Sequence, residues 1–438
     1  MTEAGQIGQT GAGDAGRAPA ASTRSGRRIN VAAAVIGNTL EWFDILVYAT
    51  LVPYISAKFF PGDPASSTMM ALGAFGSSFV VRPVGGIFAG WFADRAGRRG
   101  ALALISILMF VGTGMIAFLP GHESIGIAAP ALLLLARLIQ GFAARGEFGS
   151  APAHLAEQSR SRRGYYASWQ FASQGLGILM AALFGAVLTS ILPDQAMGDW
   201  GWRVPFVFGM LVGPVAYVIR FHADESPEFA QAAEQRHDRA DLVLDRGFWG
   251  RVMVGAALVV VGSAMLYLLI YMPTLVTAQF GVSRSASLWT SVCAGLTLLC
   301  ATPVAGAIGD RYGRQWLALP SCALLVPAPI LLFHLLDANP TATQALLTQF
   351  LLALPVAAYL GALAAMLSDL FSLRHRSLGL AICYNAAVVA AGAFAPLIYA
   401  ELGARVGRVA PSYYASAAAV ISLLALGIVL SRRWLPRD

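Results

Sequence analysis

The sequence is poor in charged residues, and this scarcity indicates the class of protein. Of the 438 residues, 12% are charged and 57% are hydrophobic. Soluble domains carry about 25% charged residues. A chain of this size with so few charges lacks the polar surface that a soluble protein needs. The composition therefore predicts an integral membrane protein, with the lipid bilayer as its surroundings.

Lysine is almost absent: Lys58 is the single lysine among the 30 lysine and arginine residues. The arginines that make up the rest fall in short clusters between apolar runs. The net charge of +7 is basic enough to raise the question of nucleic-acid binding. However, clusters of this kind are typical of the cytoplasmic loops of membrane proteins. We therefore expect no nucleic-acid partner.

Motifs for chemistry are also missing. The four cysteines lie inside apolar runs and show neither disulfide nor zinc spacing: Cys293, Cys300, Cys322 and Cys383. The sequence has no nucleophile motif, metal-ligand cluster or phosphate-binding loop. It therefore predicts a protein that is not an enzyme, binds no metal and needs no cofactor.

Long apolar runs are abundant, and twelve of them reach the length of about 20 residues that a membrane helix needs. They lie near 30–52, 68–92, 100–119, 130–154, 165–190, 203–221, 248–272, 285–308, 316–336, 343–367, 377–400 and 411–431. Charge is concentrated between the sixth and seventh runs. We therefore expect five regions: a disordered cytoplasmic tail (1–28), a six-helix bundle (29–221), a cytoplasmic linker (222–247), a second six-helix bundle (248–431) and a cytoplasmic tail (432–438).

A short cationic motif occurs twice, as GWFADRAGRR at 90–99 and as GAIGDRYGR at 306–314. Asp94 and Asp310 are 216 residues apart, about half the chain. Repeats at this spacing are typical of transporters made of two related membrane bundles. The sequence therefore predicts an all-α membrane fold of 12 transmembrane helices in two pseudo-symmetric six-helix bundles.

Acidic and basic residues cluster at corresponding positions of the two halves, at one end of the predicted helices. We expect salt bridges among them to close an inner gate, although membrane anchoring by arginine is the alternative. The candidate gating residues are Asp94, Arg98, Glu157, Arg163, Asp310, Arg314, Asp369 and Arg376. The excess of arginine in alternate loops also places both termini in the cytoplasm of a multi-pass protein of the plasma (bacterial inner) membrane.

The first apolar run contains two acidic residues. Glu41, Asp44 and Tyr48 are spaced by three and four residues, so they share one face of a helix. Ionisable side chains inside a membrane are costly and tend to mark an ion or substrate path. Arg137 in the fourth run is a candidate partner for these acids. Exchange of partners can couple transport to protons, and a static structural role is the alternative.

Other polar and aromatic side chains in the apolar runs are candidates for substrate binding. The alternative interpretations are hydrogen bonds between helices and aromatic core packing. The candidates are Tyr48, Arg82, Gln140, Arg145, Glu147, Trp169, Gln170, Gln174, Tyr267, Tyr271 and Asn385, with Tyr384 beside the last of these. Gly85 and Gly86 after Arg82 are expected to serve close helix packing.

These motifs resemble the major facilitator superfamily over the chain from about residue 29 onward. The two loop motifs and RLIQGFAARGE at 137–147 match its general pattern. GNTLEWFD at 37–44, VRPVGG at 81–86 and WGWRVPF at 200–206 resemble its metabolite:proton symporters. RGYYASWQFASQ at 163–174 is most similar to the citrate and tricarballylate branch.

The resemblance implies a carrier that imports a carboxylate-bearing metabolite with protons by alternating access. A citrate-like di- or tricarboxylate is the favoured substrate, and we expect the carrier to work as a monomer. It places proton coupling on Asp44 or Glu41, with Arg137 as the partner. Arg145 departs from the family pattern, which has a small or apolar residue there. The alternatives are a symporter for a zwitterionic osmolyte (proline or betaine) or a shikimate-like acid, a drug exporter, and a membrane sensor that binds solute without moving it.

Overall fold

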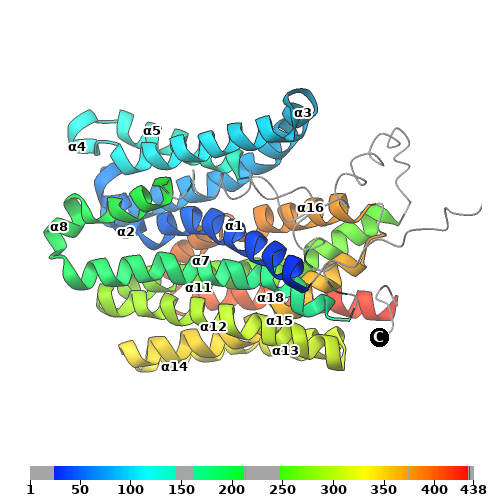
Figure 1. Cartoon of the computed structure of the whole chain (residues 1–438). Helices are drawn as coiled ribbons and strands as arrows, with labels where there is room; N and C mark the ends of the chain where they lie inside the picture. Colours follow the sequence, from blue (N-terminus) through cyan, green and yellow to red (C-terminus); the bar gives the residue numbers. More distant parts are fainter. Residues whose placement is uncertain are drawn as a thin grey trace, which may run out of the picture.

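The computed structural model describes residues 24–144, 155, 159, 161–211, 213, 247–372, 375–432 and 434. Within these residues all regular elements are helices, and most run roughly along one common direction (Figure 1). Most of the linker expected at 222–247 and of the tails expected at 1–28 and 432–438 lies outside the described residues. The fold is all-α, as predicted.

The first half follows the predicted order of spans. The elements are α1 (Arg24–Thr50), α2 (Val52–Phe59), α3 (Pro64–Phe118), α4 (His122–Ile125), α5 (Ala128–Ala143), α7 (Arg163–Ile191), α8 (Asp194–Asp199), η2 (Gly201–Arg203) and a helical stretch at 204–211. Together α1 and α2 form the first span, bent by 62° between its two parts. The long α3 covers the second and third spans.

The second half likewise provides six spans. Its elements are α11 (Phe248–Phe280), α12 (Arg284–Tyr312), α13 (Arg314–Leu324), α14 (Ala328–Ala338), α15 (Ala342–Asp369), α16 (Arg376–Ala387), η4 (Val388–Gly392), α17 (Ala395–Arg405) and α18 (Ala410–Ser431). The ninth span combines α13 with α14, and the eleventh combines α16, η4 and α17. Each of the twelve predicted runs is therefore occupied by helix in the described part of the chain.

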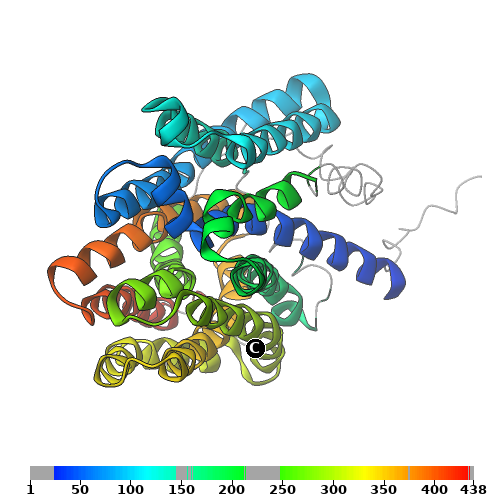
Figure 2. The ribbon, with the colours of Figure 1, turned by 90° about the vertical axis from the view of Figure 1, so that its left-hand side faces the viewer.

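The first cationic motif turns the chain within α3. The helical assignment continues through the motif, but Gly97 has φ 75°, a conformation that favours glycine over residues with a Cβ. The sequence predicts a loop at 90–99, whereas the chain reverses at this one glycine between two helical segments. Figure 2, which looks along the helices, shows the later, light-blue part of α3 and the cyan α5 on the side opposite the yellow α13 and α14.

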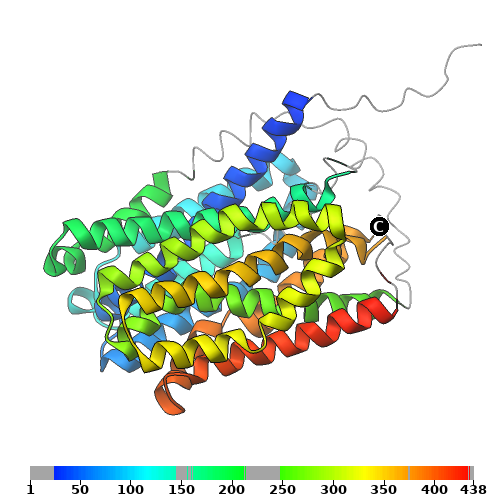
Figure 3. The ribbon, with the colours of Figure 1, turned by 90° about the horizontal axis from the view of Figure 1, so that it is seen from below.

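The two halves meet along α7 and α12, which lie side by side (Figures 1 and 3). Glycines allow this contact from one end to the other. A Cβ on Gly175 would lie 2.7 Å from Leu298 Cβ, and one on Gly306 would lie 2.6 Å from the Gly164 carbonyl oxygen. Small residues let membrane helices approach closely enough to pack well without a hydrophobic driving force. This contact fixes the halves beside one another around the candidate site.

Close packing inside the first half positions its buried arginine. Gly141 of α5 lies against the backbone of Ser78 in α3, and Gly85 of α3 lies against the backbone of Phe142. The packing role expected of Gly85 is therefore confirmed. The same expectation for Gly86 is wrong, because a Cβ there would meet nothing within 4 Å. Because the two backbones touch, the Ser78 hydroxyl comes within reach of Arg137 on α5.

Candidate functional site

Arg137 is completely buried inside the first half, with an exposed fraction of 0%. It donates hydrogen bonds to Gln140 Oε1 at 2.8 Å and to Ser78 Oγ at 3.0 Å, and Gln140 Nε2 donates to Thr113 Oγ1 at 2.9 Å. Its guanidinium carbon lies 4.5 Å from the centroid of the Tyr48 ring, a cation–π distance. In this state the described hydrogen-bond partners of Arg137 are therefore neutral groups, not the carboxylates that the sequence suggests.

Asp44 lies on the same side of α1 as Tyr48 but turns toward the sixth span. Its Oδ1 approaches Gly209 so closely that a Cβ on that glycine would clash. Asp44 is within electrostatic range of Arg137, yet among the described residues it makes no hydrogen bond or ion pair. A carboxylate in this position is available to take up a proton. Glu41, one turn earlier, is within electrostatic range of Tyr384 in the other half.

Arg82 is a second buried guanidinium, on α3. Its exposed fraction is 8%, and its charged carbon lies 3.9 Å from the centroid of the Phe79 ring and 5.8 Å from that of Trp42. Its Nε and Nη2 atoms are buried and have no hydrogen-bond partner within the described residues. Buried donors of this kind are rare in native structures, and a charged one is the most costly to leave without a partner.

A small cavity lies between the halves. Side chains from both halves line it, including Trp42, Phe171 and Gln174 from the first half and Ser263, Tyr267 and Tyr384 from the second. Tyr267 packs edge-on against Phe75 and Phe79, with ring centroids 6.0 and 5.6 Å apart. The Phe75 ring also lies 5.3 Å from the guanidinium carbon of Arg137. We call this space the central cavity.

The structure brings only some of the predicted substrate residues to this place. Gln174 and Tyr267 line the central cavity, as does Tyr384, which the sequence ranks among the candidates of the eleventh span. The Arg82 guanidinium carbon lies 5.8 Å from the ring of Trp42. Trp42 also lines the cavity and is missing from the sequence candidates, although it lies between Glu41 and Asp44 in the motif GNTLEWFD. An aromatic residue beside two intramembrane acids is the signal that identifies it.

Other candidates make structural contacts instead. Gln170 donates to Asn38 Oδ1 at 3.2 Å, which joins α7 to α1. Trp169 packs edge-on against Tyr165, Tyr271 stacks on Tyr399, and Asn385 donates to the Ala381 carbonyl within its own helix. Tyr48 donates to the Ala71 carbonyl at 3.0 Å, and Gln140 belongs to the Arg137 network.

Several predicted residues cannot be placed. Arg145, Glu147 and Glu157 lie outside the described residues, and for Asp94 and Arg98 the description covers the backbone and not the side chain. Their roles therefore stay predictions.

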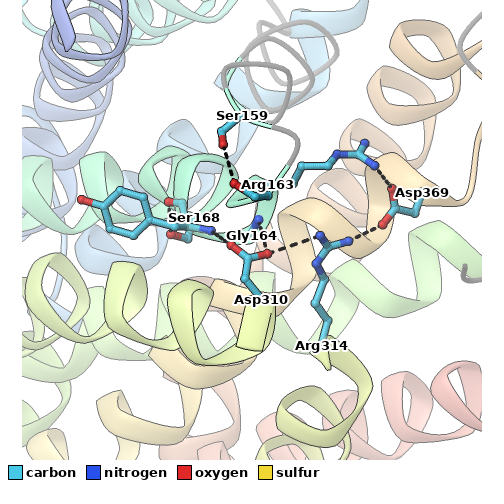
Figure 4. A network of polar contacts seen from close by, with 9 residues as sticks. Ser159, Arg163, Gly164, Ser168, Asp310, Arg314 and Asp369 are labelled. Carbon is cyan, nitrogen blue, oxygen red and sulfur yellow. Dashed lines mark hydrogen bonds and ion pairs between the residues drawn. The ribbon is translucent and has the colours of Figure 1, made fainter. Parts of the chain in front are cut away.

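At one end of the molecule the gating candidates of both halves meet (Figure 4). The Asp310 carboxylate accepts hydrogen bonds from the backbone amides of Gly164 at 2.7 Å and Tyr165 at 2.8 Å, at the start of α7. Arg314 pairs with both Asp310 and Asp369. Arg163 pairs with Asp369 at 3.1 Å. We call this set the inner network; each of its two carboxylates connects the second half to α7 of the first.

Arg376, the remaining gating candidate, is buried behind the inner network. Its Nε donates to the Ser368 carbonyl at 2.9 Å, next to Asp369 in sequence. Carboxylates at the start of a helix are favoured by its unpaired amides and its dipole. The inner network can therefore hold the two halves together at this end. The halves can separate here only when these ion pairs break.

Comparisons with known proteins agree with this architecture. Residues 29–253 match the family model described as "Sugar (and other) transporter", and residues 253–438 match "Major Facilitator Superfamily". In the solved structures, a crystal structure of the D-xylose-proton symporter superposes with a TM-score of 0.73 at 19% identity, covering 93% of this chain and 98% of that one. At that identity the likeness shows the fold alone.

Curated relatives are similar over most of their length. The citrate-proton symporter of Klebsiella pneumoniae is 33% identical over 411 residues, 92% of each chain. The proline/betaine transporter of Escherichia coli (strain K12) is 31% identical over 411 residues, 90% of this chain and 81% of that protein. The two relatives carry different classes of substrate at similar identity.

Proposed function

Because this chain belongs to the major facilitator superfamily, and is a transporter rather than an enzyme, we propose that it imports a carboxylate-bearing metabolite together with protons. A citrate-like di- or tricarboxylate is the favoured substrate, as in the citrate-proton symporter of Klebsiella pneumoniae. The solute binds in the central cavity, and the two halves open alternately to either side of the membrane.

The observation that carries this proposal is the buried guanidinium of Arg82. Two of its nitrogens have no hydrogen-bond partner within the described residues. Its guanidinium carbon lies 5.8 Å from the ring of Trp42, which lines a cavity between the two halves. A substrate carboxylate can accept two parallel hydrogen bonds from such a group, which gives both affinity and orientation. The site therefore favours an anionic group on the solute.

Proton coupling is assigned to Asp44, with Glu41 as the other candidate and Arg137 as the partner. Asp44 is close enough to Arg137 to feel its charge but forms no ion pair with it in this state. Deprotonation of Asp44 increases its attraction for the guanidinium, and protonation removes it. This change in partners can shift the balance between inward-open and outward-open states.

A zwitterionic osmolyte is the second candidate substrate, favoured by one observation. The cavity places the rings of Trp42, Tyr267 and Tyr384 near a single described guanidinium. Aromatic rings of this kind bind quaternary ammonium groups. The proline/betaine transporter of Escherichia coli (strain K12) is also similar to this chain at 31% identity.

Uptake into proteoliposomes tests the proposal. With an inward proton gradient, labelled citrate or another carboxylate should accumulate, and a protonophore should abolish the accumulation. An excess of betaine or proline should leave carboxylate uptake unchanged. Accumulation of betaine or proline in place of carboxylates would identify the osmolyte symporter, and binding without uptake would identify a sensor.

The inner network is assigned to the inner gate. Asp369→Asn should leave Arg163 and Arg314 without their shared carboxylate, and charged hydrogen bonds contribute about 1.5–3 kcal/mol each. We therefore expect the inward-open population to rise by roughly 10-fold or more. Distances between spin labels on the ends of α7 and α15 measure that population. Glu401→Gln, which breaks an exposed pair within α17, is the control, and equal populations in the two variants would contradict the assignment.

The remaining sequence expectations complete the proposal. We place the bundles at 29–221 and 248–431, with the linker at 222–247 and both termini in the cytoplasm of a bacterial inner-membrane protein. The positive-inside distribution of arginine supports this orientation. The end that carries the inner network is then the cytoplasmic end, and the protein works as a monomer.

A further inference from the structure

Three of the buried polar side chains without partners lie at or near the central cavity, and others lie elsewhere in the described part of the chain. Besides Arg82, neither the Tyr267 hydroxyl nor the Gln174 amide makes a hydrogen bond of normal length within the described residues. The Tyr384 hydroxyl lies near the Gln174 amide. Gln174 and Tyr267 are each 1% exposed, and both line the cavity. More than nine in ten buried polar groups in native structures have a partner. A ligand in the cavity is the simplest partner for three such groups from three helices.

The contrast with Gln170 shows that this feature belongs to the cavity and not to glutamine on α7. Gln170 is one turn from Gln174 on the same helix and is also buried, but its side chain donates to Asn38 Oδ1 at 3.2 Å. Asn38 in turn donates to the backbone carbonyl oxygen of Gln170 at 3.1 Å. The packing of α1 against α7 therefore satisfies one amide and leaves the other facing the cavity.

The hydrogen-bonding capacity of these groups defines a complementary ligand. Arg82 offers donors only, which suits a carboxylate. The Gln174 amide offers both a donor and an acceptor, and the Tyr267 hydroxyl can act as either. A carboxylate next to them offers no donor to the Gln174 side-chain carbonyl, which would then depend on the nearby Tyr384 hydroxyl. A ligand hydroxyl, which donates and accepts at once, satisfies both kinds of atom.

The groups are also close enough to act on one solute. The Tyr267 hydroxyl is within electrostatic range of Arg82, and the Arg82 guanidinium carbon is 5.8 Å from the ring of Trp42, which lines the same cavity. A carboxylate on Arg82 thus leaves the carbon beside it near Gln174 and Tyr267. The rest of the cavity wall is largely aromatic and aliphatic.

We propose that Gln174, together with Tyr267, recognises a hydroxyl group of the substrate, so that the protein selects hydroxycarboxylates over the same acids without the hydroxyl. The inference rests on the proposed function, because Arg82 holds the carboxylate in both. It adds a specificity-determining residue from each half. A site built to bind a hydroxyl discriminates strongly against its absence, because the buried polar groups are then left without partners.

Matched pairs of solutes test the proposal in proteoliposomes of the full chain. Citrate and tricarballylate differ only by the hydroxyl, as do malate and succinate. For the pair that is transported, the wild-type protein should prefer the hydroxyl-bearing member by at least about 10-fold in uptake at limiting concentration. Gln174→Leu should reduce this ratio to below about twofold. Tyr267→Phe, which removes one oxygen and keeps the ring, should reduce it to an intermediate value.

Gln170→Leu is the matched control, because it removes the same amide one turn away and should leave the ratio as in wild type. Size-exclusion profiles in detergent identify variants that fail to fold. If Gln174→Leu fails to fold, the uptake ratio of Tyr267→Phe tests the proposal in its place. A wild-type ratio near one, or a ratio unchanged in both Gln174→Leu and Tyr267→Phe, would overturn the proposal.

Failure of the proposed function gives a different result. If neither carboxylate pair is taken up, the carboxylate assignment is wrong. Recognition of the hydroxyl is then judged with carnitine and γ-butyrobetaine, zwitterions that differ by one hydroxyl, using the same variants and the same ratios. Loss of preference in Gln174→Leu for that pair supports the inference, and unchanged preference overturns it.

Discussion

Asp44→Asn is expected to abolish proton-driven accumulation while leaving exchange of substrate across the membrane intact. Asparagine has nearly the same shape as protonated aspartate, so the contact with Gly209 is retained, but it cannot release a proton. A gradient of two pH units supplies about 2.7 kcal/mol per proton, enough for an accumulation of about 100-fold. In the variant the accumulation ratio should fall to about one, measured with the membrane potential clamped at zero.

Asp63→Asn is the matched control for this variant. Asp63 caps the start of α3 outside the predicted spans, where its side chain accepts a hydrogen bond from the Ser66 amide at 3.0 Å. The Asp63→Asn variant should accumulate substrate as the wild type does. If Asp44→Asn accumulates substrate as the wild type does, Asp44 does not couple protons and Glu41 becomes the candidate. Loss of exchange as well as accumulation in a folded variant would assign Asp44 to binding and not to coupling.

Arg82→Gln is expected to weaken carboxylate binding by roughly 30-fold or more. Removing one partner of a buried, hydrogen-bonded charge pair costs about 2–5 kcal/mol. Arg82→Lys keeps the charge but loses the two parallel hydrogen bonds, so its affinity should lie between those of the wild type and the glutamine variant. Isothermal titration with citrate measures all three.

The control for Arg82 is Arg405→Gln, at the exposed end of α17, where the side chain pairs only with Glu401 among the described residues. Its affinity should equal that of the wild type. If Arg82→Gln binds citrate with wild-type affinity, the substrate carboxylate does not bind at Arg82. A weakened citrate affinity together with unchanged betaine affinity would show that the two solutes bind through different groups.

The sequence predicts the fold well because the bilayer imposes a simple rule on length and polarity. Each long apolar run contains helix in the described part of the chain, and the repeated motifs mark the two halves. The positions at which helices bend or break are harder to predict from the sequence. The reversal at Gly97 occupies a single residue inside helical geometry, and the π-helix η4 interrupts the eleventh span without any proline or polar cluster at 388–392. Such breaks depend on neighbouring helices as well as on local sequence.

The candidate site was less predictable, because sequence gives the face of a helix but not its neighbours. Gln170 and Gln174 have the same chemistry and share a face, and only the crossing of α1 over α7 gives the first a partner and leaves the second at the cavity. Arg137 suggested a carboxylate partner. The contact of Gly141 with Ser78 instead provides a hydroxyl at 3.0 Å. Distances between helices decide these assignments.

The hydrogen bonds from Gly164 and Tyr165 to Asp310 have a consequence for the speed of the cycle. The first amides of α7 take their acceptor from the other half, so each opening at this end exposes them to bulk water and dissolved anions. Chloride or phosphate can then occupy the vacated helix start. If re-formation of the inner network limits the transport rate, that rate should fall as ionic strength rises, even at a saturating concentration of substrate.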